Sequence, residues 1–289
     1  MRPRHRRAAQ SDHQDHGSSE VRDPGERLPD PVISKAFTAR LARGQAALVP
    51  YVTAGYPERG STLGVMEALA DAGADVIELG VPFSDPLADG PTIQHASFVS
   101  IGKGMTVHGV LDDLASFRAR RDTPVVLFTY LNPLLRYGLT AFLRDAVAAG
   151  AHGLLVTDLP TGSDPQIEAE ITASPLDLIR LVAPTTPVER VPEVAKGGSG
   201  FLYYISRMGV TGTRTELRTE LAAEVGRIRA AVELPVAVGF GISSPEQAAA
   251  VAAVADGVVV GSAIIQALDR GGAAEAGRFL ASLRKQMDG

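Results

Sequence analysis

The sequence contains no cysteine and no tryptophan, and only 5% of its residues are aromatic. Without cysteine the chain has no disulfide bond, no thiolate metal ligand and no cysteine nucleophile. A net charge of −5 gives no basic excess that would favour a nucleic-acid partner. No apolar run reaches the length of about 18 residues that crosses a bilayer. We therefore expect a cytoplasmic protein that binds neither nucleic acid nor membranes.

The first 30 residues differ in composition from the rest of the chain. They include five hydrophobic residues, against six Lys or Arg and six Asp or Glu. Such a segment cannot bury enough apolar surface to offset the entropy lost on ordering. No apolar stretch follows its arginines, which disfavours a signal peptide. We predict a disordered leader over residues 1–32 and one folded domain over residues 33–289.

From Ile33 onward, short apolar runs alternate with amphipathic stretches. Each run has four to seven residues and most are rich in Val, Ile or Leu, which is typical of strands buried on both faces of a parallel sheet. The runs are Ala46–Val52, Asp75–Leu79, Pro124–Phe128, Gly153–Val156, Leu178–Val182, Phe201–Ile205, Pro235–Phe240 and Gly257–Val260.

Eight strands, each followed by a helix, predict an α/β fold of the (β/α)₈ or TIM-barrel type. Residues 33–43 predict a short N-terminal helix that plugs the bottom of the barrel. An open doubly wound sheet is the alternative, but it would usually have fewer strands or a second domain. The glycine motif expected after its first strand is also absent.

Two segments between the runs have clear helical signals. Leu221, Val225, Ile228 and Val232 follow the spacing of one apolar helix face. Ser244, Pro245, Glu246 and Gln247 predict a helix start, with serine as the N-cap, proline in the first turn and glutamine closing a capping box.

Two acidic residues are candidates for catalysis because active sites of such barrels lie at the carboxyl ends of the strands. Glu78 is near the end of an apolar strand, where burial should raise its pKa toward the working pH of a general acid or base. A structural salt bridge to an arginine is the alternative. Asp89 follows eleven residues later in a loop with three prolines, and its pairing with Gly90 fits either function or turn chemistry.

Glycines cluster after the predicted sixth, seventh and eighth strands. They occur at Gly209 and Gly212, at Gly239 and Gly241, and at Gly261 before Ser262, where a helix can begin. Backbone N–H groups at such places, together with a helix dipole, favour an anion, and the loops after strands seven and eight are the common phosphate site of this fold. The alternative is that these glycines only permit tight turns.

Lysine and histidine placement excludes two common mechanisms. None of the four lysines is at the carboxyl end of a predicted strand, so no amine is placed for Schiff-base chemistry. No two histidines have metal-ligand spacing with a carboxylate, so we expect no metal site. What remains is metal-free acid–base chemistry by carboxylates on a phosphorylated substrate.

Several motifs resemble one family in order along the chain. The stretch Glu78–Gln94 is similar to the signature of the tryptophan synthase alpha chain. Pro50–Pro57 resembles that family's first strand and turn, Gly209–Gly212 its sixth loop, and Gly239–Pro245 its seventh-strand phosphate loop. The similarity extends from about Ile33 to the C-terminus.

The resemblance implies cleavage of indole-3-glycerol phosphate to indole and glyceraldehyde 3-phosphate. Glu78 would be the acid and base, Asp89 would hydrogen-bond the indole N–H, and Tyr203 would lie near the reacting glycerol. Positions matching the family's indole pocket are Tyr51, Phe128 and Phe240, and positions matching its phosphate contacts are Thr211, Gly212, Gly241, Gly261 and Ser262. The segment around Phe128 departs from some members, and Met208 stands where members have Ser or Thr.

The resemblance also implies a partner. The family's alpha chain binds a beta chain that uses pyridoxal phosphate, in an α₂β₂ assembly, and the alpha chain itself needs no cofactor. The loop around Asp85 and the sixth loop would lie at that interface. A stand-alone lyase without a beta chain and a catalytically idle regulatory barrel are the alternatives.

Overall fold

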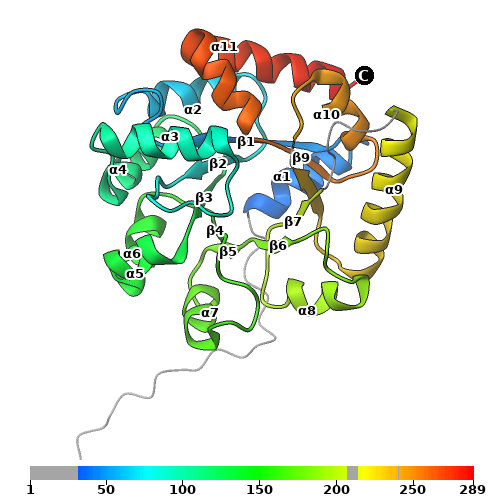
Figure 1. Cartoon of the computed structure of the whole chain (residues 1–289), viewed down its shortest axis with the longest axis horizontal. Coiled ribbons are helices and arrows are strands. Elements are labelled where there is room, and N and C mark those ends of the chain that lie inside the picture. The colour runs from blue at the N-terminus through cyan, green and yellow to red at the C-terminus, as the bar shows by residue number, and fades with distance from the viewer. Residues whose placement is uncertain (1–31, 207–213, 240) are drawn as a thin grey trace, which may run out of the picture.

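The computed structural model describes residues 32–206, 214–239 and 241–289. Figure 1 shows the strands gathered in the middle of the molecule with helices around them. The strands are β1 (Ala47–Thr53), β2 (Ile77–Gly80), β3 (Val125–Thr129), β4 (Gly153–Val156), β5 (Asp177–Leu178), β6 (Arg180–Val182), β7 (Leu202–Ile205), β8 (Val236–Gly239) and β9 (Gly257–Val260). The helices are α1 (Val32–Leu41), α2 (Thr62–Asp71), α3 (Pro91–Gly102), α4 (Val107–Arg118), α5 (Leu131–Tyr137), α6 (Leu139–Ala148), α7 (Pro165–Thr172), the 3₁₀ helix η1 (Val188–Arg190), α8 (Val191–Ala195), α9 (Arg214–Ala231), α10 (Pro245–Ala252) and α11 (Ser262–Met287).

The strands form a parallel barrel, as the sequence predicts. Their order is β5-β4-β3-β2-β1-β9-β8-β7-β6, and the two edge strands, β5 and β6, are separated along the chain by Ile179 alone. The structure has nine strands there rather than eight because the predicted strand Leu178–Val182 is divided. Its first part pairs with β4 and its second part with β7. Ile179 N still donates to Leu154 O at 2.9 Å, so the division is a change of neighbour within one extended segment.

The inside of the barrel is packed by alternate residues of the strands and by α1. Ile33 and Phe37 of α1 are fully buried, and the Phe37 ring stacks on Phe201 with 5.1 Å between centroids. The predicted plug helix is therefore confirmed. The strand residues in this inner cluster include Ala47, Val49, Val76, Val126, Leu155, Ile179, Phe201, Ala237 and Val259.

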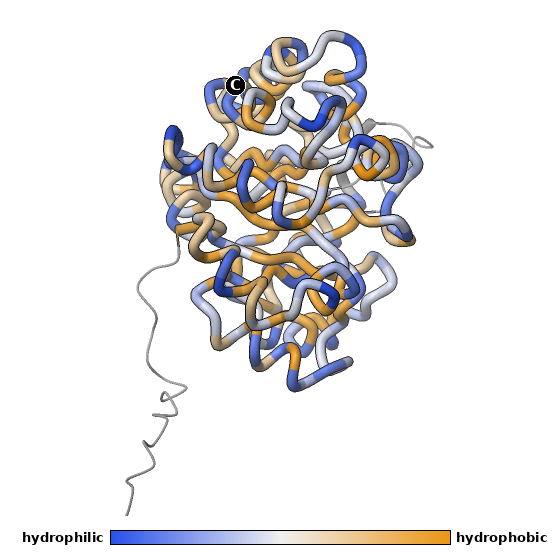
Figure 2. The backbone as a smooth tube through the Cα atoms, turned by 90° about the vertical axis from the view of Figure 1, so that its left-hand side faces the viewer, coloured by the Kyte–Doolittle hydropathy of each residue, from blue (hydrophilic) through white to orange (hydrophobic). Residues whose placement is uncertain are grey.

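A second apolar layer lies between the barrel and its helices. Figure 2 shows that hydrophobic residues gather in the middle of the molecule, while hydrophilic residues are more common toward the periphery. On α9 the predicted apolar face is confirmed, since Leu221, Val225 and Ile228 are buried. Val232 follows the end of that helix and is half-buried.

The predicted helix start before α10 is confirmed, with one difference. The Ser244 side chain accepts from Gln247 N at 3.3 Å, and Pro245 occupies the first turn. The Gln247 side chain, however, accepts from Ser243 N at 2.8 Å, one residue before the N-cap. A capping box would return this bond to the N-cap residue itself.

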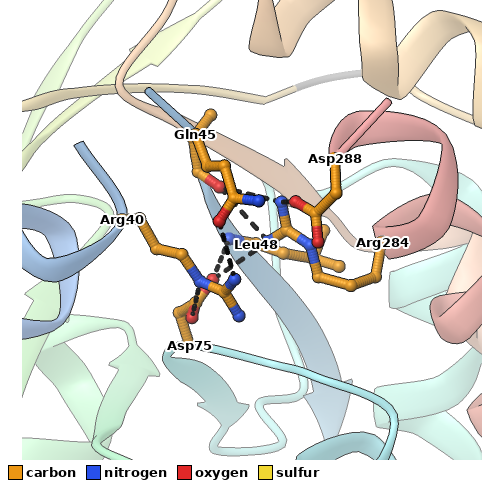
Figure 3. Close-up of polar contacts among 7 residues, drawn as sticks. Arg40, Gln45, Leu48, Asp75, Arg284 and Asp288 are labelled. Carbon is orange, nitrogen blue, oxygen red and sulfur yellow. Dashed lines mark hydrogen bonds and ion pairs between the residues drawn. The ribbon is translucent and has the colours of Figure 1, made fainter. Parts of the chain in front are cut away.

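A polar network fixes the amino-terminal end of the barrel (Figure 3). Asp75, just before β2, accepts from Arg40 Nε at 2.6 Å, from Leu48 N at 2.8 Å and from Arg284 Nη1 at 3.1 Å. Arg284 also donates to Ala46 O at 3.2 Å. The network therefore joins α1, β1, β2 and α11 at the end opposite the predicted site. The Asp75 and Arg284 side chains are largely buried, and each has several hydrogen bonds. Their charges therefore avoid the cost of an unpaired buried ion.

Two further predictions concern membrane-spanning segments and the N-terminal leader. Among the described residues, no helix is long and apolar enough to cross a membrane. The predicted leader lies almost wholly outside the described residues, and α1 begins at Val32, one residue before the predicted domain. The division into leader and barrel stays a prediction.

Candidate active site

Several of the predicted site residues come together above the inner apolar layer, at the carboxyl ends of the strands. Side chains alternate along a strand, so Glu78, two residues beyond Val76, shares its inward face. Tyr51 of β1 lies opposite Glu78 in the parallel register, and Phe128 of β3 is two residues beyond the inward Val126. The rings of Tyr51 and Phe128 meet edge to face at 5.2 Å.

Glu78 is a buried carboxyl group with no charge partner in the part of the chain that the structure describes. It is 1% exposed, and its Oε1 has no hydrogen-bond partner. Within the described ranges no arginine or lysine forms an ion pair with it, so the structural salt bridge is not seen there. Burial raises the pKa of Glu78 to about 8, because a carboxylate loses hydration when buried. Near neutral pH the group therefore holds its proton and can donate it.

Because its pKa is raised, Glu78 lowers the free energy of unfolding at high pH. Its pKa rises from 4.5 to about 8 on folding, so between these values the unfolded chain holds fewer protons and stability falls as pH rises. At about 1.4 kcal/mol per tenfold change in proton affinity, the full effect is up to roughly 5 kcal/mol.

We expect Glu78→Gln to have nearly unchanged stability at pH 4 and to exceed the parent increasingly up to about pH 8. Urea unfolding of both proteins at pH 5, 7 and 9 measures this, because all other titrating groups are common to both. A difference that does not vary with pH would contradict the buried, protonated state.

Two tyrosines lean over glycines at the same level of the barrel. A Cβ atom on Gly80 would lie 2.2 Å from Tyr51 Oη, and one on Gly239 would lie 2.3 Å from Tyr203 Oη. Each glycine sits two residues beyond the register partner of its tyrosine, Glu78 for Tyr51 and Ala237 for Tyr203. The absence of side chains at these positions is what admits the rings.

Both phenols remain protonated donors at ordinary pH. Burial raises the pKa of Tyr51, and the nearby carboxylates of Asp89 and Glu78 raise it further. The pKa of Tyr203 is raised by burial first and then by Glu78 and Asp89. The same interactions show that β1, β2, β7 and the loop after β2 bring their polar groups into one region.

Asp89 reaches this region from the loop between β2 and α3. Its N–H donates to Pro86 O at 3.0 Å, and its carbonyl accepts from Gln94 Nε2 at 2.9 Å. Gly90 has φ −75° and ψ 164° and precedes α3, so this pair is not a turn that depends on a positive φ. Burial raises the pKa of Asp89 to about 6, while a hydrogen bond from the Tyr130 hydroxyl lowers it. At neutral pH Asp89 is therefore ionised, whereas Glu78 is protonated.

The predicted anion site is next to this region. Gly261 follows β9 and is the N-cap of α11, which begins at the exposed Ser262. A Cβ on Gly261 would lie 3.6 Å from Tyr51 Cβ, which places the start of α11 beside the tyrosine. Gly241, beyond β8, has φ +78°. Since β8 and β9 are paired neighbours, their following loops lie side by side, with backbone N–H groups and a helix dipole available for an anion.

Three predicted binding residues, Thr211, Gly212 and Phe240, lie outside the described residues. Asp85 is described and lies apart from the carboxylates, exposed on the loop, where its Oδ2 accepts from Ser84 Oγ at 2.5 Å. In the described ranges, no three His, Asp or Glu side chains gather as metal ligands.

Sequence reasoning missed Tyr130. Its hydroxyl bonds to both Ala88 and Asp89. The available signal was its place directly after β3, two residues beyond the inward-facing Phe128.

The chain is similar along most of its length to proteins of one family. The family model described as "Tryptophan synthase alpha chain" matches residues 37–287. The tryptophan synthase alpha chain of Burkholderia mallei is 46% identical over 262 residues, which cover 89% of this chain and 97% of that protein. That of Gluconacetobacter diazotrophicus is 50% identical over 238 residues, covering 82% and 87%.

Solved structures give the same result. The tryptophan synthase subunit alpha of Legionella pneumophila is similar with a TM-score of 0.83 at 37% identity, covering 90% of this chain and 99% of that one. A chain in the aminoacrylate-bound tryptophan synthase of M. tuberculosis has a TM-score of 0.80 at 36% identity, covering 89% and 99%.

Proposed function

Because the chain belongs to the tryptophan synthase alpha chain family, we propose that Glu78, Asp89 and Tyr203 carry out the reaction of that family. The alpha subunit cleaves indole-3-glycerol phosphate to indole and glyceraldehyde 3-phosphate, a step of tryptophan biosynthesis. The chain is a lyase, and the bond broken assigns it to the carbon–carbon lyases.

Glu78 is suited to move the proton that the cleavage requires. The protonated carboxyl donates to C3 of the indole ring, which places a positive charge on the ring and its nitrogen. The resulting carboxylate then takes the proton of the hydroxyl on the glycerol carbon attached to C3. The carbon–carbon bond breaks as the aldehyde forms, and its electron pair restores the indole. Glu78 ends protonated, as it began.

Asp89 stabilises the charge formed in the first step. Its carboxylate, ionised above about pH 6, accepts a hydrogen bond from the indole N–H as that nitrogen becomes positive. An ionised group held in a partly buried site stabilises a developing charge more than water does, because it is already oriented.

Binding groups fill the remaining roles. The neutral Tyr203 phenol lies near Glu78 and can hydrogen-bond the glycerol part of the substrate. Tyr51 and Phe128 form one wall for the indole, to which Phe240 would add. Gly241, Gly261 and Ser262 would hold the phosphate through backbone N–H groups, together with Thr211 and Gly212.

The observation that supports this assignment most is the pairing of opposite protonation states. Glu78, buried and uncharged with a free Oε1, and Asp89, ionised on the following loop, both lie near the phenols of Tyr51 and Tyr203. The test is release of indole from indole-3-glycerol phosphate by the purified chain, alone and with a beta chain. We expect release in both cases and a gain with the beta chain. No release in either case would favour an idle regulatory barrel, and fast release without any gain would favour a stand-alone lyase.

We expect Gly239→Ala to impair the reaction through Tyr203. The new methyl group would lie 2.3 Å from Tyr203 Oη and 2.8 Å from Cζ, so the ring must move. A displacement of about 1 Å at a site can cost about 10²-fold in rate. The measurement is kcat/KM for indole release.

A double-mutant cycle with Tyr203→Ala provides the control for this clash. Gly239→Ala should cost little more in the Tyr203→Ala background, where no ring remains to be displaced. Equal losses of kcat/KM in both backgrounds would show that Gly239→Ala does not act by displacing the Tyr203 ring.

A beta chain is the proposed partner, and the loop of Asp85 is the proposed contact. Leu87, on the same loop, is 91% exposed, and Phe98 of α3 is 78% exposed. Large apolar side chains exposed to solvent are typical of a protein–protein contact. We expect an α₂β₂ assembly in the cytoplasm.

Pyridoxal phosphate is expected on the beta chain. On this chain the lysines Lys35, Lys103, Lys196 and Lys285 lie on helices or just after them rather than on strands. None of them is placed at the site, so the chain offers no amine there for a Schiff base.

A further inference from the structure

Tyr130 has no role in the reaction described above, yet it is the residue that ties Asp89 to the barrel. It follows β3 directly and precedes α5. It is 4% exposed, and its ring packs on Phe83 with 5.2 Å between centroids. Its position is therefore fixed by strand and packing, while the loop that it contacts is largely exposed.

The Tyr130 hydroxyl contacts two consecutive residues of that loop. It accepts a hydrogen bond from Ala88 N at 3.0 Å, and it lies within reach of the Asp89 carboxylate, whose pKa it lowers as a proton donor would. One hydroxyl can do both, because its lone pairs and its proton are separate. At the start of the loop Val81 N donates to Phe128 O of β3 at 2.9 Å. The described bonds nearer Asp89 are internal, such as Leu87 N to Asp85 O at 2.9 Å, or come from α3, which follows the loop directly.

We propose that Tyr130 is a positioning residue, whose hydroxyl holds the Asp89 carboxylate and the adjacent Ala88 amide where Asp89 meets the indole N–H. The proposal rests on the role proposed for Asp89. Loss of the hydroxyl would free the carboxylate to turn, and would leave the Ala88 amide without this acceptor. Tyr130 itself touches no reacting atom in this arrangement.

The hydrogen bond also has a consequence for pH dependence. A hydrogen bond to the charged form of an acid lowers its pKa, and on Asp89 this effect opposes that of burial. The groups that interact with Asp89 in the described structure are the phenols of Tyr51 on β1, Tyr203 on β7 and Tyr130. Tyr130→Phe leaves the Tyr51 and Tyr203 hydroxyls in the chain, so the acid limb of the rate profile should report the loss of the Tyr130 hydroxyl.

The test is Tyr130→Phe, which removes one oxygen and keeps the ring. We expect kcat/KM for indole release at pH 6.5 to fall by about 10- to 100-fold, as for loss of a hydrogen bond to a charged group. We expect the acid limb of the profile to move to higher pH and the basic limb to stay. In an Asp89→Asn background, Tyr130→Phe should cost less than a further twofold.

The matched control is Tyr137→Phe. Tyr137 also donates to an aspartate, Asp145 Oδ2 at 2.8 Å, but on α5 and α6. We expect kcat/KM of Tyr137→Phe, and both the acid and the basic limb of its pH profile, to match those of the parent.

Each outcome separates the two proposals. If Asp89→Asn alone leaves turnover unchanged, the role of Asp89 fails. If Asp89→Asn is strongly impaired while Tyr130→Phe keeps both its rate and its acid limb, the positioning proposal fails alone. It fails equally if Tyr130→Phe loses activity only in proportion to its unfolded fraction, measured by circular dichroism, with the limb unmoved.

Discussion

Glu78→Gln is expected to lower kcat for indole release by about 10²- to 10⁴-fold, the usual range for loss of a general acid and base. The amide has nearly the shape of the protonated carboxyl, so it fits the same buried position. It cannot give a proton to C3 or take one from the glycerol hydroxyl. Both proton transfers are lost together, and the expected value lies at the upper end of the range.

Substrate binding should survive this change, because Glu78 is uncharged when the substrate arrives. Calorimetric titration with indole-3-glycerol phosphate then measures a dissociation constant within a few-fold of the parent's binding, while turnover is nearly absent. Unchanged turnover would remove Glu78 from the mechanism. Loss of both binding and turnover would assign it to the shape of the pocket instead.

Asp177→Asn is a matched control for Glu78→Gln. Asp177 is also a buried carboxyl whose pKa is raised by burial, but it begins β5 at the opposite end of the barrel. We expect its kcat to match the parent after correction for the folded fraction. A loss equal to that of Glu78→Gln would show that removing any buried carboxyl disturbs the barrel.

Asp89→Asn is expected to lower kcat/KM by about 10²- to 10³-fold, the usual cost of removing one group that stabilises a developing charge. The amide can still accept a hydrogen bond from the indole N–H, but it has no negative charge to oppose the positive ring. The effect should therefore fall on kcat more than on KM. A neutral result would return this loop to turn chemistry.

The pH profile distinguishes a charge effect from a change of loop shape. In the parent we expect kcat/KM to rise near pH 6 as Asp89 ionises and to fall near pH 8 as Glu78 loses its proton. In Asp89→Asn the limb assigned to Asp89 should disappear and the limb near pH 8 should remain. Persistence of the lower limb would assign it to another group, such as the substrate phosphate.

Much of the fold could be predicted because its signals are local. Apolar runs of four to seven residues mark the strands, and the predicted Gly153–Val156 and Gly257–Val260 match β4 and β9 without a shift. The N-cap at Ser244 is likewise a contact between near neighbours. The division of the fifth strand at Ile179 could not be predicted, because it depends on which strand lies on each side.

The candidate site divides in the same way. The contiguous motif from Glu78 to Gln94 identified both acids, since their spacing is written in one segment. The role of Tyr130 was not foreseen, because its hydroxyl meets Ala88 across 42 residues of sequence. The Tyr203 ring fits only because Gly239, on the next strand, has no side chain. No local sequence pattern connects these two residues.

The sequence alone determined the alternation of strands and helices, the burial of the strands and the acids on one loop and one strand, because these depend on neighbouring residues. The sequence predicted that burial would raise the pKa of Glu78, but only the tertiary structure decided how far. The hydration that Glu78 loses depends on the whole barrel, to which β1, β2, β3 and β7 all contribute, and not on the residues beside it alone.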